Sequence, residues 1–238
     1  MIKKKKKMLN ELKDFISSEK VKISNSICSK IKKDDQKGLS QVIGRRYGFI
    51  WEEIVKIIFK YDDKVVLRGK VFYRDFVEKW VEKNCQEFEN ECCRANSKRL
   101  LLKYISETTA TDMQDLCDLT IEFKDKIYAI DTKYRFNSND SNTVREIANS
   151  AIHLKEIGYI PIMLIRKSRE CSQKAPINRF ERNGWKIIDD ANAIEFIKSI
   201  TDFDLSEFIK NELNIWEFLK PYQDDLIRLR YGEKDWIY

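Results

Sequence analysis

The spacing of hydrophobic residues changes along this chain, from a helical period in the first third to the alternation of strands in the middle. Apolar residues recur every three or four positions within residues 8–33, 39–61 and 73–93, which predicts three helices. A further helix is expected over residues 97–105. Residues 65–68 form a short apolar run typical of a strand.

Two segments in the middle of the chain are rich in β-branched and aromatic residues. They cover residues 118–123 and 126–134 and are separated only by Lys124 and Asp125, which predicts a β-hairpin. Downstream, the pattern predicts strands over residues 160–165 and 185–188. It predicts helices over residues 143–157, 176–182, 192–200 and 205–219.

Helix-end signals support part of this reading. Thr143 and Glu146 match a capping box, and Gly158 stands where a C-terminal glycine belongs. The order of elements predicts the α/β class, with a mixed central sheet flanked by helices and helical additions at both ends of the chain.

Neither a repeat nor a linker-like segment interrupts the 238 residues, so we expect a single domain. Within it we distinguish a basic N-terminal helical arm (1–37), a core (39–200) and a C-terminal helical extension (201–238). Residues 1–37 contain 12 lysines and 5 acidic residues, and the remainder contains 33 basic and 34 acidic residues. The net charge of +6 therefore lies in the arm, which either neutralises phosphates or acts as a solubilising tail.

Composition excludes several classes of protein. The single histidine, His153, is too few for an HNH nuclease or a multi-histidine zinc site, and the six cysteines form no CxxC pair. No secretory signal follows the lysine run, and no apolar stretch approaches the roughly 18 residues of a membrane span. We expect a cytoplasmic protein with reduced thiols that neither associates with a membrane nor binds a small-molecule cofactor. Its chemistry should depend on carboxylates, lysine and hard metal ions.

One grouping of charged residues stands out in the predicted hairpin. Asp131 and Lys133 are two apart on the second strand, so alternation places both on one face. If residues 124 and 125 form a two-residue turn, counting back from it sets Asp118 opposite Asp131. Two carboxylates and an ammonium then converge, a grouping that phosphodiester hydrolysis can use: carboxylates hold Mg²⁺, and the lysine stabilises the developing charge. The alternative for Asp131 and Lys133 is a surface ion pair.

A fourth charged residue lies on the predicted helix that precedes the sheet. Glu52 is on the same side of that helix as Gly48, which permits a close approach to the sheet. Glu53 competes with Glu52 for this role, and an exposed helix carboxylate is the alternative for either.

Together Glu52, Asp118 and Asp131-Thr-Lys133 resemble the PD-(D/E)XK nuclease motif. The surrounding segments, over about residues 39–200, are similar to type II restriction endonucleases of the ApaLI-like group. The resemblance implies a restriction-endonuclease-like core and a homodimer that cuts both strands of a short site in double-stranded DNA. It implies Glu52, Asp118 and Asp131 as ligands of Mg²⁺ and all four residues as catalytic.

The sequence departs from the motif at one position. Cys117 stands before Asp118 where the family pattern has proline, and Asp112 and Asp115 are rivals for the role of Asp118. The proline is not a metal ligand, so the departure weakens the motif as a string and leaves its chemistry intact.

Two groups of polar residues are candidates for contact with DNA. The loop residues Asn137, Asn139 and Asn142, followed by Arg145, carry groups that hydrogen-bond base edges or phosphates, although turns favour the same residue types. Lys98 and Arg99 share a predicted helix and either follow the phosphate backbone or form a solvated face.

Other functions remain open from sequence alone. A repair nuclease or junction resolvase would use the same metal centre. A non-catalytic DNA-binding module could keep the fold, and a glycoside hydrolase would use paired carboxylates but has no need of Lys133.

Overall fold

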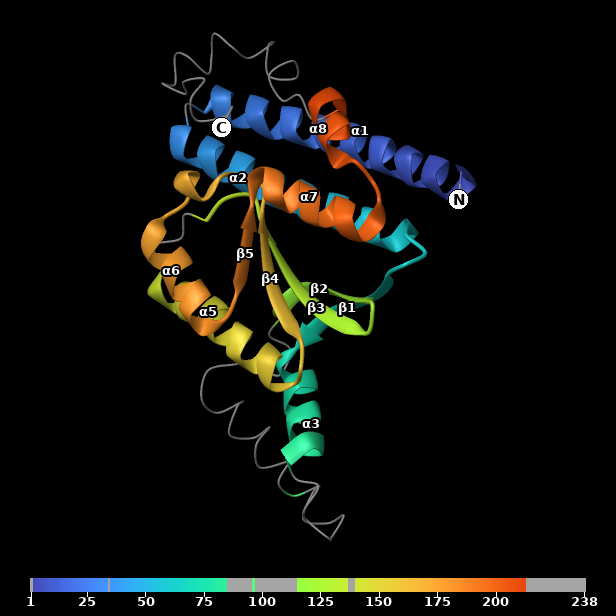
Figure 1. Cartoon of the computed structure of the whole chain (residues 1–238). Helices are drawn as coiled ribbons and strands as arrows, with labels where there is room; N and C mark the ends of the chain where they lie inside the picture. The colour runs from blue at the N-terminus through green and yellow to red at the C-terminus, as the bar shows by residue number, and fades with distance from the viewer. Residues whose placement is uncertain (1, 34, 85–95, 97–114, 137–139, 213–238) are drawn as a thin grey trace.

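The computed structural model describes residues 2–33, 35–84, 96, 115–136 and 140–212. Its elements (Figure 1) are, in chain order, α1 (Ile2–Lys32), α2 (Gln36–Tyr61), β1 (Val66–Phe72), α3 (Tyr73–Asn84), β2 (Asp115–Phe123), β3 (Lys126–Lys133), α5 (Ser141–Glu156), β4 (Ile160–Ile165), the 3₁₀ turn η1 (Arg169–Cys171), α6 (Lys174–Asn183), β5 (Lys186–Asp189), α7 (Asp190–Thr201) and α8 (Leu205–Glu212). The helix predicted over residues 97–105 lies outside the described residues, as do the ends of those predicted over 73–93 and 205–219.

The five strands form one mixed sheet in the order β1-β2-β3-β4-β5. β1, β2 and β3 are antiparallel neighbours, whereas β3, β4 and β5 run parallel. The helices α5 and α6 make the two parallel connections, as the longer crossovers of parallel strands require. This arrangement confirms the predicted α/β class with a mixed central sheet.

The turn of the β2–β3 hairpin sets the register of the whole site. Lys124 and Asp125 both have positive φ, at 49° and 59°, as a type I′ two-residue hairpin turn requires. Phe123 consequently pairs with Lys126, and the pairing runs back to Leu119 opposite Ile130. The register counted from the sequence is therefore confirmed.

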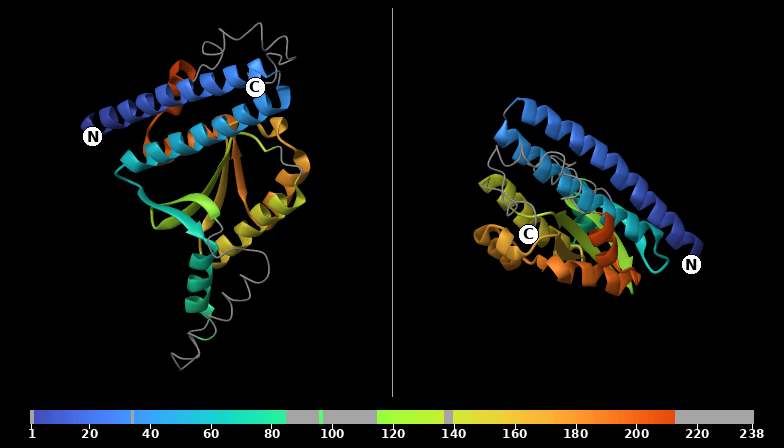
Figure 2. Two further views of the ribbon diagram at one scale, coloured as in Figure 1. Left: turned by 180° about the vertical axis from the view of Figure 1, so that it is seen from behind. Right: turned by 90° about the horizontal axis from the view of Figure 1, so that it is seen from above.

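Helices cover both faces of the sheet, and alternation along each strand divides its side chains between them. On one face, residues such as Ile130 and Leu164 pack with α1, α2, α7 and α8. On the other, residues such as Ala129 and Met163 pack with α3, α5 and α6. Figures 1 and 2 show these layers with the sheet between them.

The segment predicted as a basic arm is the helix α1, which lies antiparallel along α2 as an outer layer (Figure 2). Its apolar stripe is buried, with Leu12, Ile16, Ile23 and Ile27 each at most 3% exposed. The lysines at residues 3–7 are exposed. Although α1 has 31 residues, neither it nor any other described helix carries an apolar stretch that could cross a membrane.

The beginning of α5 corrects one prediction. The N-cap is Asp140, not Thr143: its side chain accepts hydrogen bonds from the backbone N–H of Asn142 at 3.0 Å and from Thr143 Oγ1 at 2.7 Å. Aspartate is a strong N-cap, and here it starts the helix two residues before the threonine. The end of α5 agrees with the sequence, since Gly158 has φ of +82°.

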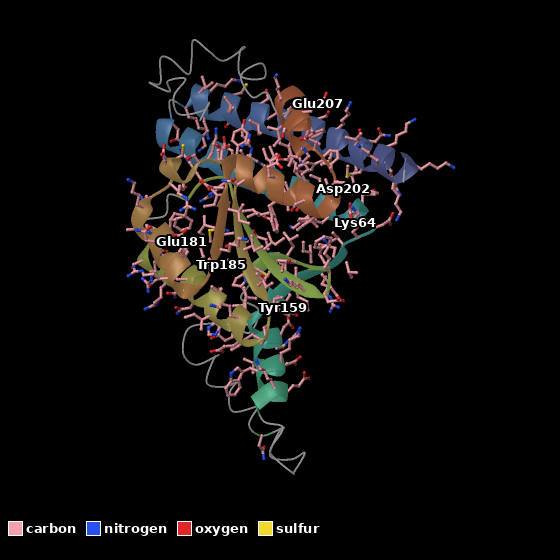
Figure 3. The ribbon with its side chains drawn as sticks, in the orientation of Figure 1. Lys64, Tyr159, Glu181, Trp185, Asp202 and Glu207 are labelled. Atoms are coloured by element: carbon pink, nitrogen blue, oxygen red, sulfur yellow. The ribbon has the colours of Figure 1, made fainter. Side chains whose placement is uncertain are left out.

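Polar contacts tie distant elements together around this core. The indole N–H of Trp185 donates to the backbone carbonyl of Ile147 in α5 at 2.7 Å. Lys64, just after α2, forms an ion pair with Asp202 at the end of α7, and Figure 3 labels both residues where these elements meet.

Candidate functional site

The candidate site lies where β2 and β3 part. Their pairing ends at Leu119 and Ile130, while β2 continues beside β1. The next positions, Asp118 and Asp131, therefore stand at the open end of the hairpin. This is also the carboxyl end of the parallel strands β3 and β4, the edge at which open α/β sheets usually bind ligands.

Asp131 is buried on the face of the sheet that packs with α5. It is 6% exposed and forms an ion pair with Lys133, whose side chain remains 28% exposed. Ala129, on the same face, is wholly buried. A carboxylate in such surroundings is costly unless it is paired or binds a cation.

Asp118 is held by the residue between Asp131 and Lys133. Its Oδ2 accepts hydrogen bonds from the backbone N–H of Thr132 at 2.7 Å and from Thr132 Oγ1 at 2.8 Å. Because the pairing of β2 with β3 ends at Ile130, the backbone N–H of Thr132 has no carbonyl acceptor on β2. The Asp118 carboxylate accepts its hydrogen bond instead. Sequence reasoning missed Thr132, because alternation alone assigns its side chain to the opposite face.

The two carboxyl groups are in hydrogen-bond contact and influence each other's acidity. Burial, together with the charge of Asp118, raises the pKa of Asp131 to about 7 despite the nearby Lys133. Burial also acts to raise the pKa of Asp118, but the charge of Lys133 and the hydrogen bonds from Asp131 and Thr132 outweigh it, and the pKa lies below its ordinary value. The close pair therefore holds a proton at slightly acidic pH, as carboxylates sharing one site do.

Lys133 remains a cation in this environment. Burial alone would lower its pKa, but the charges of Asp131 and Asp118 outweigh it and raise the pKa above its ordinary value. An ammonium of this kind can stabilise negative charge and is a poor general base at neutral pH.

Glu52 lies near the site without joining it. Its helix is anchored to the sheet by Trp51, whose indole N–H donates to the carbonyl of Leu164 at 3.0 Å. The charge of Glu52 contributes to the raised pKa of Lys133, so it is within electrostatic reach. Its carboxylate forms an ion pair with Lys56, which also binds the rival Glu53 at 2.9 Å.

A second lysine near the site was not anticipated. Lys70 of β1 forms an ion pair with Asp115, and the charges of Asp118 and Glu52 also raise its pKa. The strand predicted over residues 65–68 stopped short of Lys70 because Gly69 interrupts the apolar pattern; Gly69 has φ of +84° at an irregular point of β1. Asp115 is thereby paired with Lys70, and Asp112 lies outside the described residues.

Of the residues proposed to contact DNA, two are described. Asn142 and Arg145 are exposed near the beginning of α5, where Arg145 Nη2 donates to Asn142 Oδ1 at 3.3 Å. Asn137, Asn139, Lys98 and Arg99 lie outside the described residues.

The donor set fits a hard divalent cation. Asp118 and Asp131 offer two carboxylates in contact, whose mutual repulsion a cation would relieve, and Mg²⁺ in proteins is commonly held by one or two carboxylates with water and phosphate oxygens. Within the described part of the chain, no three His, Cys, Asp or Glu residues are grouped so as to share one ion. The structure therefore brings together Asp118, Asp131 and Lys133. Glu52 is nearby, but its carboxylate forms an ion pair with Lys56.

Comparisons with protein-family models, with curated proteins and with solved structures found no match to this chain. The function is therefore argued from the geometry and chemistry of the site.

Proposed function

We propose that this chain is a Mg²⁺-dependent endonuclease that hydrolyses phosphodiester bonds of double-stranded DNA. The single observation that carries the proposal is the contact of two carboxyl groups, one of them buried, with a lysine in an ion pair with the buried one. A buried carboxyl pair is unfavourable in a merely structural role, and its chemistry matches that of a phosphoryl-transfer centre.

Each residue has a defined part in the reaction. Asp118 and Asp131 would hold Mg²⁺, which when bound polarises the phosphate and lowers the pKa of water. Thr132 orients Asp118 through its two hydrogen bonds. Lys133 stabilises the negative charge that develops on the phosphate oxygens, in keeping with its raised pKa. Glu52 would complete the site by exchanging its partner Lys56 for the ion or its water.

The resemblance to ApaLI-like enzymes supports a finer proposal. In this form the chain is a type II restriction endonuclease that acts in the cytoplasm as a homodimer on a short specific site. A homodimer places one such site at each strand of the duplex, as cutting of both strands requires.

The test is DNA cleavage by the purified full chain with Mg²⁺, using mixed plasmid and genomic DNA, followed by sequencing of the ends. We expect cleavage that a chelator abolishes. Asp131→Asn should reduce turnover by at least about a hundredfold, the loss typical of removing one preorganised polar group. Asp125→Asn is the matched control: it makes the same substitution at the exposed turn of the same hairpin, where asparagine tolerates positive φ.

The outcomes separate the alternatives. Discrete fragments with one common end sequence support the restriction enzyme, whereas cleavage confined to branched or damaged DNA indicates a repair nuclease. Equal turnover of Asp131→Asn and Asp125→Asn would overturn the assignment of the site.

A further inference from the structure

Three cationic residues follow the candidate site at the carboxyl ends of two neighbouring strands. Arg135 comes two residues after Lys133, and Arg166 and Lys167 come directly after β4. The parallel pairing continues past the strand ends: Arg166 N donates to the carbonyl of Lys133 at 2.9 Å, and Lys167 N donates to that of Tyr134 at 3.0 Å. We call Arg135, Arg166 and Lys167 the basic edge.

The backbone fixes the basic edge next to the catalytic lysine. Arg166 is hydrogen-bonded through its backbone to Lys133, and Arg135 lies two residues after Lys133, beyond a bend at Tyr134. Arg135 is exposed, and the side chain of Arg166 is 22% exposed. Both side chains therefore reach solvent at the same carboxyl end of the sheet as the carboxylates.

A stacked pair of tyrosines packs against the lysine of the basic edge. Tyr134 stacks on Tyr47 of α2 with ring centroids 5.1 Å apart, and Lys167 Nζ lies 5.6 Å from the Tyr134 centroid. Packing of this kind restricts the lysine to a defined position. The edge is thus held by the sheet and by α2.

The positive charges of the edge oppose one another. Burial lowers the pKa of Lys167, and the charges of Arg166 and Arg135 lower it further. Asp190 contacts Arg166, but at 3.5 Å, and it is more than half exposed, so it offsets the repulsion weakly. An anion that binds across these cations would relieve their mutual repulsion.

We propose that the basic edge binds the phosphate backbone of the DNA strand next to the phosphodiester that is cut. Arginine matches phosphate with two parallel hydrogen bonds, and lysine adds a point charge. The inference rests on the proposed function for the identity of the nucleic acid. It goes beyond it by assigning three residues, outside the carboxylate site, to hold the substrate in register.

The experiment measures binding separately from cleavage. The full-length wild-type chain is titrated against a short fluorescent duplex in the presence of a chelator, so that no cutting occurs, over a series of salt concentrations. We expect the double variant Arg166→Gln/Lys167→Gln to bind at least about tenfold more weakly near physiological salt. The slope of log affinity against log salt should fall by about 2, since each lost phosphate contact removes about 0.9.

The matched control is Arg182→Gln/Lys186→Gln, which removes the same charge from exposed positions at the opposite, amino-terminal end of β5. It should bind within about twofold of the wild type, because charges more than about 8–10 Å from the DNA are screened at this salt. Arg135→Gln, at an exposed residue outside the strands, provides a second test that should lower the slope by about 1. Thermal unfolding of each variant verifies that it folds.

Three results would overturn the inference. The first is equal DNA affinity and salt slope for Arg166→Gln/Lys167→Gln and its control. The second is an unchanged slope for Arg135→Gln in a folded protein. The third is loss of binding to polyglutamate with unchanged binding to DNA, which would assign the edge to an acidic protein. A chain that cuts no DNA but loses DNA affinity through these variants would refute the nuclease and retain the basic edge.

Discussion

At the scale of single residues, the acidity of Asp131 is the property that most sharply distinguishes this site. The carboxyl group is buried, touches Asp118 and shares Lys133 with it, and its pKa rises to about 7. A raised pKa means that the folded chain retains a proton that the unfolded chain releases near its ordinary value of 3.8. Stability and pH are therefore linked through this one group.

We predict that the free energy of unfolding of the metal-free chain falls as pH rises from about 4 to about 7 through the contribution of Asp131. Over this range the folded state binds more protons than the unfolded state, so raising the pH favours unfolding. Asp131→Asn removes the contribution, because an amide does not titrate. Urea unfolding at a series of pH values, in a chelator, measures the difference between the two proteins.

His153 and Asp118 also titrate with shifted pKa values, and both affect how stability depends on pH. Burial lowers the pKa of His153, which gives a slope of opposite sign below about 6.5, so the informative quantity is the wild type minus the variant. The lowered pKa of Asp118 adds stability that is lost only below its ordinary range. Asp125→Asn should retain the wild-type slope, and excess Mg²⁺ should flatten it by favouring the ionised carboxylates. Identical pH profiles for the wild type and Asp131→Asn would contradict the prediction.

At the scale of elements, the contact between α1 and α2 depends on a buried acid. Glu19 is wholly buried and accepts from Lys22 at 2.7 Å and from Arg46 Nη1 of α2 at 3.3 Å. A glutamate among the polar positions of a lysine-rich helix gives no sequence signal of burial, and its position became evident only once α2 was packed against it.

We predict that Glu19→Ala lowers the free energy of unfolding by about 1.5–3 kcal/mol, the range for hydrogen bonds to charged groups. The matched control is Glu11→Ala on the same helix, which binds Lys60 and Tyr61 but is partly exposed. Its loss should stay within about 1 kcal/mol, because water replaces an exposed ion pair readily. Urea unfolding at neutral pH measures both, and equal losses would show that burial of Glu19 is unimportant.

At the scale of the whole molecule, α1 belongs to the hydrophobic core. It contributes five buried apolar side chains to the layer over α2: Met8, Leu12, Ile16, Ile23 and Ile27. At about 1.5–3 kcal/mol for each, their burial approaches the total stability of a typical domain. The lysine run is the exposed beginning of a helix whose remainder holds the fold together.

Deletion of residues 1–33 should therefore abolish cooperative thermal unfolding or lower Tm severely. Deletion of residues 1–6 is the control: it removes four exposed lysines, including the Lys4 ion pair with Asp63, and leaves the five apolar side chains in place. Circular dichroism melting compares the three proteins. A chain without residues 1–33 that melts like the wild type would show that α1 is dispensable to the fold.

Much of the candidate site was determined locally by the sequence. Alternation places Asp131 and Lys133 on one face, and the two-residue turn at Lys124 and Asp125 sets Asp118 opposite Asp131. These relations lie within one hairpin, so local backbone geometry fixes them before the rest of the chain is considered. The α/β class followed in the same way from the order of the periodic segments.

Only the tertiary structure decided the rest. Three interactions depend on which segments pack together and on where strand pairing ends. They are the ion pair of Lys70 with Asp115, the ion pair of Glu52 with Lys56, and the hydrogen bonds of Thr132 to Asp118. The same is true of the basic edge, because β3 and β4 are neighbours in the sheet but are separated in the sequence by α5. Such contacts minimise the free energy of the folded chain as a whole, through burial summed over distant segments, and no local pattern of residues carries that information.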